Sequence, residues 1–231
     1  DYEAALRILT AADNFGFIGL VDHLHLFAPE FQELVRQVRH RGVVRAISAI
    51  SGNRGPGRDS WSVLWDWAPH DVAMMLKVVQ ASPVSVSATI VDCASDGTQV
   101  LENVRLVFEF ADGMVTDITT GNAFYGRCRE FTVSVDETTL SYVESPENQR
   151  SLVVAHGEDK QTVRVDSIAP LTAALAEFAT RIRSGVGGEE DLALGAEVVR
   201  ILCAANMSLR RGMAISIERV DYRATFGTVE C

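Results

Sequence analysis

The sequence predicts an α+β fold, a large and mostly antiparallel β-sheet with helices on one face. Two observations predict it. Residues 84–165 form a run of short segments in which apolar and polar residues alternate, which is typical of half-buried strands. Segments with helical spacing of apolar residues lie before and after this run, within residues 2–79 and 168–211. The order of elements therefore favours one α+β domain, a sheet covered by helices.

The first part of the chain alternates predicted helices and strands. The apolar spacing predicts, in order, a helix over residues 2–13, a strand over Gly16–Asp22, a helix over Pro29–His40 with Pro in its first turn, a strand over Val43–Ser51, and a helix that ends before Pro83.

The second part is predicted to be rich in strands. Strands are expected in VSVSATIV, VLENVRLVFEF, MVTDITTG, EFTVSVD, TLSYVE, SLVVAH and QTVRV. The Asp96-Gly97 and Asp112-Gly113 pairs are strong hairpin signals, because these residues tolerate positive φ. Helices at about 168–184 and 189–211 and a strand over Ala214–Tyr222 close the prediction.

Composition bounds the class of protein. The chain has 231 residues, 47% of them hydrophobic and 23% charged, so residues 1–231 are predicted to form a single globular domain. A net charge of −10 argues against nucleic acid or an anionic membrane as partner, because both demand a basic surface. No uninterrupted apolar run reaches the ~18 residues of a membrane span. The four scattered cysteines (Cys93, Cys128, Cys203 and Cys231) favour a reducing, cytoplasmic location.

The stretch Asn53–Asp71, NRGPGRDSWSVLWDWAPHD, carries the strongest chemical signal. Asp66 and His70 are four residues apart and are neighbours on one face of a helix. A carboxylate orients an adjacent imidazole and favours its charged form, so such a pair moves protons near neutral pH. The alternative is an Asp that caps the helix start beside a solvated His. The apolar stripe through Val72 and Met75 predicts that the pair faces away from the core.

Residues 65–71, WDWAPHD, resemble the Asp-x-Gly-x-His signature of the glucose–fructose oxidoreductase / inositol dehydrogenase / MocA family, and more closely the Trp-Asp-x-Ala-Pro-His-Asp variant of its nucleotide-sugar dehydrogenase branch. Residues 21–38, 169–185 and 189–217 are similar to further segments of that family, in the same order. The resemblance implies the C-terminal sheet domain of an NAD(P)-dependent oxidoreductase that acts on a sugar, nucleotide-sugar or cyclitol hydroxyl.

Two parts of the family pattern are missing from this sequence. The Gly-x-Gly-x-x-Gly fingerprint of the N-terminal Rossmann domain does not occur, and neither does the Glu-Lys-Pro motif that supplies a catalytic Lys. We therefore expect the chain to be the C-terminal half of a longer enzyme, inactive by itself. NAD or NADP is expected in the full-length protein and no cofactor is expected on this chain. The alternative is a non-catalytic oligomerisation or ligand-binding domain that retains the family's cleft.

By this resemblance, Asp66 and His70 are the candidate catalytic residues, and His23 is a candidate substrate-binding residue, with a structural role at the end of its strand as the alternative. Arg58 is a candidate because a guanidinium suits phosphate, and Trp65 because an aromatic face can stack on a sugar ring. The alternatives are a solvated loop arginine and a packing residue. His23 and His25 are expected to share one face of a strand without forming a metal site. Trp67 is expected to be a core residue, and Asp71 is expected to cap a helix or to be solvated. The expected partners are a sugar or nucleotide-sugar substrate, the missing nucleotide-binding domain, and a second copy of the chain that pairs through the open face of the sheet.

Overall fold

A nine-stranded mixed sheet organises the protein. The computed structural model describes residues 1–55, 62–95, 100–166 and 168–218. Within these residues the strand order is β8-β7-β6-β5-β1-β4-β3-β2-β9, and the one parallel pair joins β1 to β4. The strands are β1 (Val44–Arg54), β2 (Ser85–Ser95), β3 (Val100–Glu109), β4 (Val115–Gly121), β5 (Ala123–Val135), β6 (Thr138–Glu144), β7 (Arg150–His156), β8 (Asp159–Val163) and β9 (Ile215–Ser216). The predicted sheet, mostly antiparallel, is confirmed.

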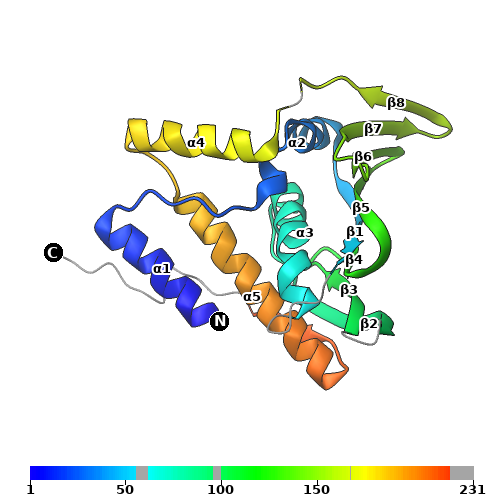
Figure 1. Ribbon diagram of the computed structural model, residues 1–231, viewed down its shortest axis with the longest axis horizontal. Coiled ribbons are helices and arrows are strands. Elements are labelled where there is room, and N and C mark those ends of the chain that lie inside the picture. The colour runs from blue at the N-terminus through cyan, green and yellow to red at the C-terminus, as the bar shows by residue number, and fades with distance from the viewer. Residues whose placement is uncertain (56–61, 96–99, 167, 219–231) are drawn as a thin grey trace.

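Helices cover one face of this sheet (Figure 1). They are α1 (Tyr2–Phe15), the short 3-10 helix η1 (Leu24–Phe27), α2 (Pro29–Arg41), α3 (Val63–Val79), α4 (Pro170–Ser184) and α5 (Glu189–Arg211). The inner helices α2, α3 and α5 contact the strands, whereas α1 packs on α5 and α4 packs on η1. The core lies between the inner helices and the sheet, and it contains the alternating residues Val104, Leu106 and Phe108, which are at most 1% exposed.

The hairpin turns follow their local chemistry. The turn after β3 contains Gly113 at φ 85°, which glycine adopts without a steric penalty, and Asp112 Oδ1 accepts a hydrogen bond of 3.0 Å from the Met114 N–H. The other predicted turn, Asp96-Gly97, lies outside the described residues.

One predicted strand differs from the structure, and another lies partly outside the described residues. Gly16–Asp22 is not a strand: Gly16 ends α1 in the left-handed conformation, and no described strand pairs with the residues that follow. Extended backbone without a neighbouring strand has no ladder to satisfy its N–H and C=O groups. The predicted strand over Ala214–Tyr222 can be compared only up to residue 218, and within that part β9 covers Ile215–Ser216.

Helix α5 is the described helix that is long and apolar enough, by length and composition, to cross a membrane. Its apolar side chains Val198, Ile201 and Leu202 are at most 2% exposed, because they pack in the core. The helix is therefore accounted for as a core element of the sheet domain.

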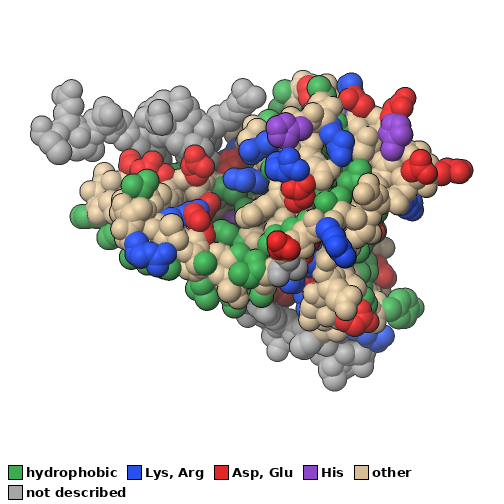
Figure 2. All heavy atoms as spheres, turned by 90° about the horizontal axis from the view of Figure 1, so that it is seen from above, with side chains coloured by type: hydrophobic (Ala, Val, Ile, Leu, Met, Phe, Trp, Pro, Cys, Tyr) green, Lys and Arg blue, Asp and Glu red, His purple; other side chains and the backbone are tan. Residues whose placement is uncertain are grey.

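Charges of both signs are mixed on the surface. On the face seen in Figure 2, Lys and Arg side chains lie among Asp and Glu side chains.

Candidate functional site

Helix α3 holds the two candidate catalytic side chains. Ser62 caps the helix, where its hydroxyl accepts a hydrogen bond of 3.3 Å from the Leu64 N–H. The stripe residues Val72 and Met75 are fully buried against the sheet, whereas Asp66 and His70 are half-buried. The helix thus places this pair at the edge of the core rather than inside it.

Two further histidines meet His70. His23 precedes η1 and His25 lies within it, and both are buried, at 7% and 8% exposure. The ring centroid of His25 lies 5.4 Å from that of His70 at an interplanar angle of 88°, and that of His23 lies 6.3 Å away at 87°. The prediction of a shared strand face was wrong, because a 3-10 turn brings these rings together instead. The short spacing of His23 and His25 was the one sequence signal for this histidine cluster.

Burial keeps all three imidazoles neutral near pH 7. It lowers the pKa of His23 to about 4, with a smaller contribution from His70, and it lowers the pKa of His25 further, with help from Arg129. The pKa of His70 is lowered by burial and then by Arg129, against the opposing effect of Asp71, Asp22 and Asp66. The sequence argument that a nearby carboxylate favours the charged ring is therefore outweighed by desolvation.

Two buried ring nitrogens have no hydrogen-bond partner within the described residues, His70 Nδ1 and His23 Nε2. An unpaired buried polar atom costs about 1–3 kcal/mol, so such atoms in a folded protein call for an explanation. A ligand group that donates to or accepts from these nitrogens would remove the cost. No group of three or more His, Cys, Asp or Glu side chains in the described part of the chain has the arrangement of a metal site.

A buried ion pair lies beside the cluster. The guanidinium of Arg129 on β5 donates to Asp71 Oδ1, and the Ser51 hydroxyl donates to Asp71 Oδ2. The side chains of Arg129 and Asp71 are 4% and 1% exposed, and Ser51 Oγ lies 2.8 Å from Thr120 Oγ1. The prediction that Asp71 is solvated or caps a helix was wrong, because Asp71 is buried in an ion pair. Its partner Arg129 is distant in sequence, and no local sequence pattern indicates the pairing.

The remaining candidates are tryptophan and arginine side chains near the start of α3. Trp65 and Trp67 are both half-buried, and both pack against the core. Arg58 lies outside the described residues. The nearby Arg54 is exposed at the end of β1.

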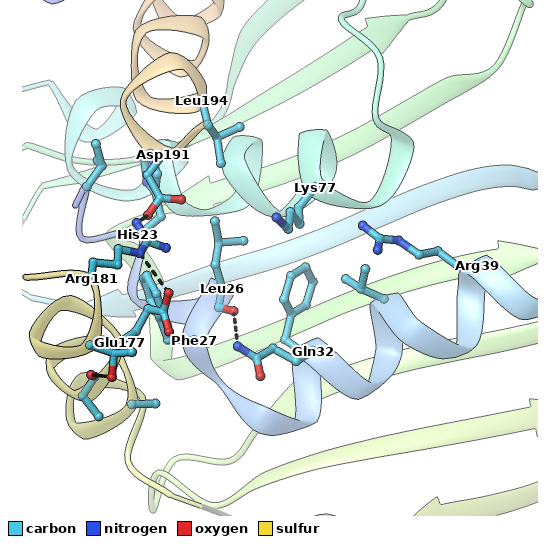
Figure 3. A pocket seen from close by; sticks show the side chains of 16 residues that line it. His23, Leu26, Phe27, Gln32, Arg39, Lys77, Glu177, Arg181, Asp191 and Leu194 are labelled. Atoms are coloured by element: carbon cyan, nitrogen blue, oxygen red, sulfur yellow. Dashed lines mark hydrogen bonds and ion pairs between the residues drawn. The ribbon is translucent and has the colours of Figure 1, made fainter. Parts of the chain in front are cut away.

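A groove of about 630 Å³ opens on His23 between α2, α4 and the start of α5 (Figure 3). Its floor is apolar, with Leu26 and Phe27, and at one end Arg181 pairs with Glu177 at 2.8 Å and Asp191 at 2.5 Å. Neither Asp66 nor His70 lines this groove, so it is separate from the carboxylate–imidazole pair.

Part of the sequence matches a known protein family, and the fold is similar to that of solved structures. Residues 35–141 match the family model described as the GFO/IDH/MocA C-terminal domain. A protein from Magnetospirillum magnetotacticum thought to be an oxidoreductase is 27% identical, with a TM-score of 0.78 over 88% of this chain and 68% of that one. No curated protein sequence matches the chain.

Two further solved structures share the fold. UDP-N-acetylglucosamine 3-dehydrogenase from Acidithiobacillus ferrooxidans is 19% identical, with a TM-score of 0.77 over 91% of this chain and 67% of that one. Aldose-aldose oxidoreductase from Caulobacter crescentus is 17% identical, with a TM-score of 0.75 over 93% of this chain and 68% of that one. The domain match over residues 35–141 and the shared sheet confirm the resemblance seen in the sequence to the C-terminal domain of the GFO/IDH/MocA oxidoreductases.

Proposed function

We propose that the chain is the substrate-binding half of an NAD(P)-dependent oxidoreductase that acts on a sugar, nucleotide-sugar or cyclitol hydroxyl. The observation that carries the proposal is the neutral, half-buried His70, which shares helix α3 with Asp66. A neutral imidazole accepts a proton, and a substrate hydroxyl is a matching donor. The names of the fold relatives, a UDP-N-acetylglucosamine 3-dehydrogenase and an aldose-aldose oxidoreductase, support a carbohydrate substrate.

In this proposal His70 takes the proton from the oxygen of the reacting hydroxyl. The carbon that carries this oxygen becomes a carbonyl carbon. Asp66, Asp71 and Asp22 favour the resulting imidazolium, because each of these carboxylates raises the pKa of His70. Burial and Arg129 oppose it, so the ring returns its proton readily. The nicotinamide, when bound, supplies the acceptor for the hydride that leaves the same carbon.

The residues of this chain fit the substrate side of such a site and not the dinucleotide side. The sequence has no Gly-x-Gly-x-x-Gly turn to receive a pyrophosphate, and no Glu-Lys-Pro motif. We assign both to a nucleotide-binding domain that partners this chain in the full-length enzyme. A 3-ketoreductase from Actinomadura kijaniata with the same fold was solved with NADP, which supports a nicotinamide cofactor for the complete protein.

The substrate contacts in this proposal are His23, Trp65 and Arg58. His23 contributes an unpaired buried Nε2 beside His70, and Trp65 has a half-buried aromatic face close to Asp66 in sequence. Arg58 would suit the phosphate of a nucleotide sugar, because a guanidinium binds phosphate through paired donors. We place the protein in a reducing, cytoplasmic compartment.

We also propose that two copies pair through the open face of the sheet. The helices cover the other face, and the open face carries Ile50, 48% exposed, beside Thr119 of β4 and Glu130 of β5. A two-fold pairing would bury this surface without obstructing the helices that hold the site.

The test uses the full-length enzyme with His70→Gln, a variant of similar size that accepts no proton. We expect turnover to fall by about 10²–10⁴-fold, the range attributed to general acid–base catalysis, with an unchanged melting temperature. His156→Gln, at an exposed His on β7, is the control. Unchanged turnover in His70→Gln would favour the alternative, a non-catalytic oligomerisation or ligand-binding domain.

A further inference from the structure

The His70 ring packs against other rings on the side of its Nδ1 atom. Its Nδ1 is buried without a hydrogen-bond partner in the described part of the chain. The closest aromatic neighbour with a defined geometry is His25, edge to face at 5.4 Å and 88°. Edge-to-face contacts restrict how a ring turns about its side-chain bonds. Whatever fixes His25 therefore also limits the orientation of His70.

A hydroxyl of the sheet fixes His25. Tyr142 OH lies 3.1 Å from His25 Nδ1, and this is the hydrogen bond that joins η1 to β6. Burial lowers the pKa of His25 and raises the pKa of Tyr142 well above its usual value, with Glu144 adding to the rise for Tyr142. Both groups therefore remain neutral across the physiological range, and their hydrogen bond persists.

Tyr142 is itself immobilised. Its side chain is fully buried, and its ring packs edge to face on Phe31 at 6.0 Å, which in turn packs on Phe131 at 5.7 Å. A continuous series of rings thus runs from the core of the sheet through Tyr142 and His25 to His70. A hydroxyl in this position serves no need of the core alone, because Phe would fill the same volume.

We propose that His25, locked by the Tyr142 hydroxyl, is a positioning residue that sets the orientation of the His70 ring toward the reacting hydroxyl. The proposal rests on the proposed function for the chemistry of His70, but the coupling of the three side chains does not. The groups that face His70 are His23 and His25 beside η1, Asp22 before it, Asp66 and Asp71 on α3, and Arg129 on β5. Nδ1 of His70 has no hydrogen-bond partner in the described structure, so the contact with His25 restricts the ring on that side.

The first experiment measures the imidazoles in this chain by nitrogen-detected NMR. Tyr142→Phe removes only the hydroxyl, and Ser141→Ala is the matched control, because it removes a hydroxyl from the adjacent residue of β6 that bonds to Thr132 instead. We expect Tyr142→Phe to shift or broaden the ring signals of both His25 and His70, and Ser141→Ala to leave them unchanged. His70 signals that are identical in the two variants would overturn the proposal.

The second experiment measures kinetics of the same variants in the full-length enzyme. We expect Tyr142→Phe to lower kcat about tenfold with KM within about twofold, since the net contribution of the one hydrogen bond that it removes corresponds to up to about one tenfold factor. His25→Asn offers an amide oxygen near the position of Nδ1 and should retain more kcat than His25→Ala. Equal kcat in these two variants, with equal melting temperatures, would count against a positioning role. If the NMR signals respond while kcat does not, the coupling stands and the chemistry assigned to His70 is refuted.

Discussion

Replacement of Asp71 by Ala should destabilise the protein far more than loss of any surface carboxylate. The Asp71 carboxylate is 1% exposed and pairs with Arg129, which is 4% exposed, so neither charge is screened by water. Asp71→Ala leaves the guanidinium buried and unpaired and leaves the Ser51 hydroxyl without its acceptor. Removal of one partner of a buried pair typically costs about 3–5 kcal/mol, and we expect a loss in this range.

The assay is urea unfolding of the chain, followed by circular dichroism and tryptophan fluorescence. Asp136→Asn is the control, because Asp136 pairs with Arg45 at 3.1 Å with both side chains more than half exposed. This control should change the free energy of unfolding by at most about 1 kcal/mol. The double variant Asp71→Ala/Arg129→Met should recover part of the loss, because it leaves no buried charge. A cost below about 1 kcal/mol for Asp71→Ala would show that water reaches the pair, and the account of this site would be wrong.

Three further predictions concern pH, cofactor and assembly. His23 has a pKa of about 4 in the folded chain and 6.5 in the unfolded chain, so the protein should lose roughly 3 kcal/mol of stability as the pH falls from 6.5 to about 4. Urea unfolding measured as a function of pH should show this loss, and His23→Asn should diminish it. The chain alone should have no dehydrogenase activity and negligible affinity for NAD(H) or NADP(H), and micromolar binding by calorimetry would contradict this. The chain should self-associate through the open sheet face, and sedimentation that gives a monomer of 25.2 kDa at micromolar concentration would refute that contact.

The strands were the most predictable part of the structure. Alternation in Val104, Leu106 and Phe108 describes one buried and one open face, and this pattern depends only on neighbours in sequence. The predicted strand over Gly16–Asp22 failed because a strand also needs a partner, and the described chain offers none at that place. Local patterning specifies which face is buried, whereas strand formation depends on what lies alongside.

The candidate site was predictable only in its local part. Asp66 and His70 share helix α3, so their spacing was enough to bring them together. The contributions of His25, Tyr142 and Arg129 depend on contacts across 45 to 117 residues of sequence, which no spacing rule reports. The pKa of His70 illustrates the consequence. Its carboxylate neighbours are visible in the sequence, but the burial and the guanidinium that outweigh them are not.

The adjacent residues His70 and Asp71 link the stability of the fold to the chemistry of the site. Successive residues of a helix point about 100° apart, so Asp71 reaches Arg129 on the sheet while His70 meets the rings of η1. The ion pair fixes α3 against β5, and the Tyr142 hydroxyl fixes η1 against β6. The two contacts on neighbouring strands therefore hold the two sides of the histidine cluster independently. Loss of Arg129 should raise the pKa of His70 and loss of Asp71 should lower it, whereas loss of the Tyr142 hydroxyl should alter its orientation.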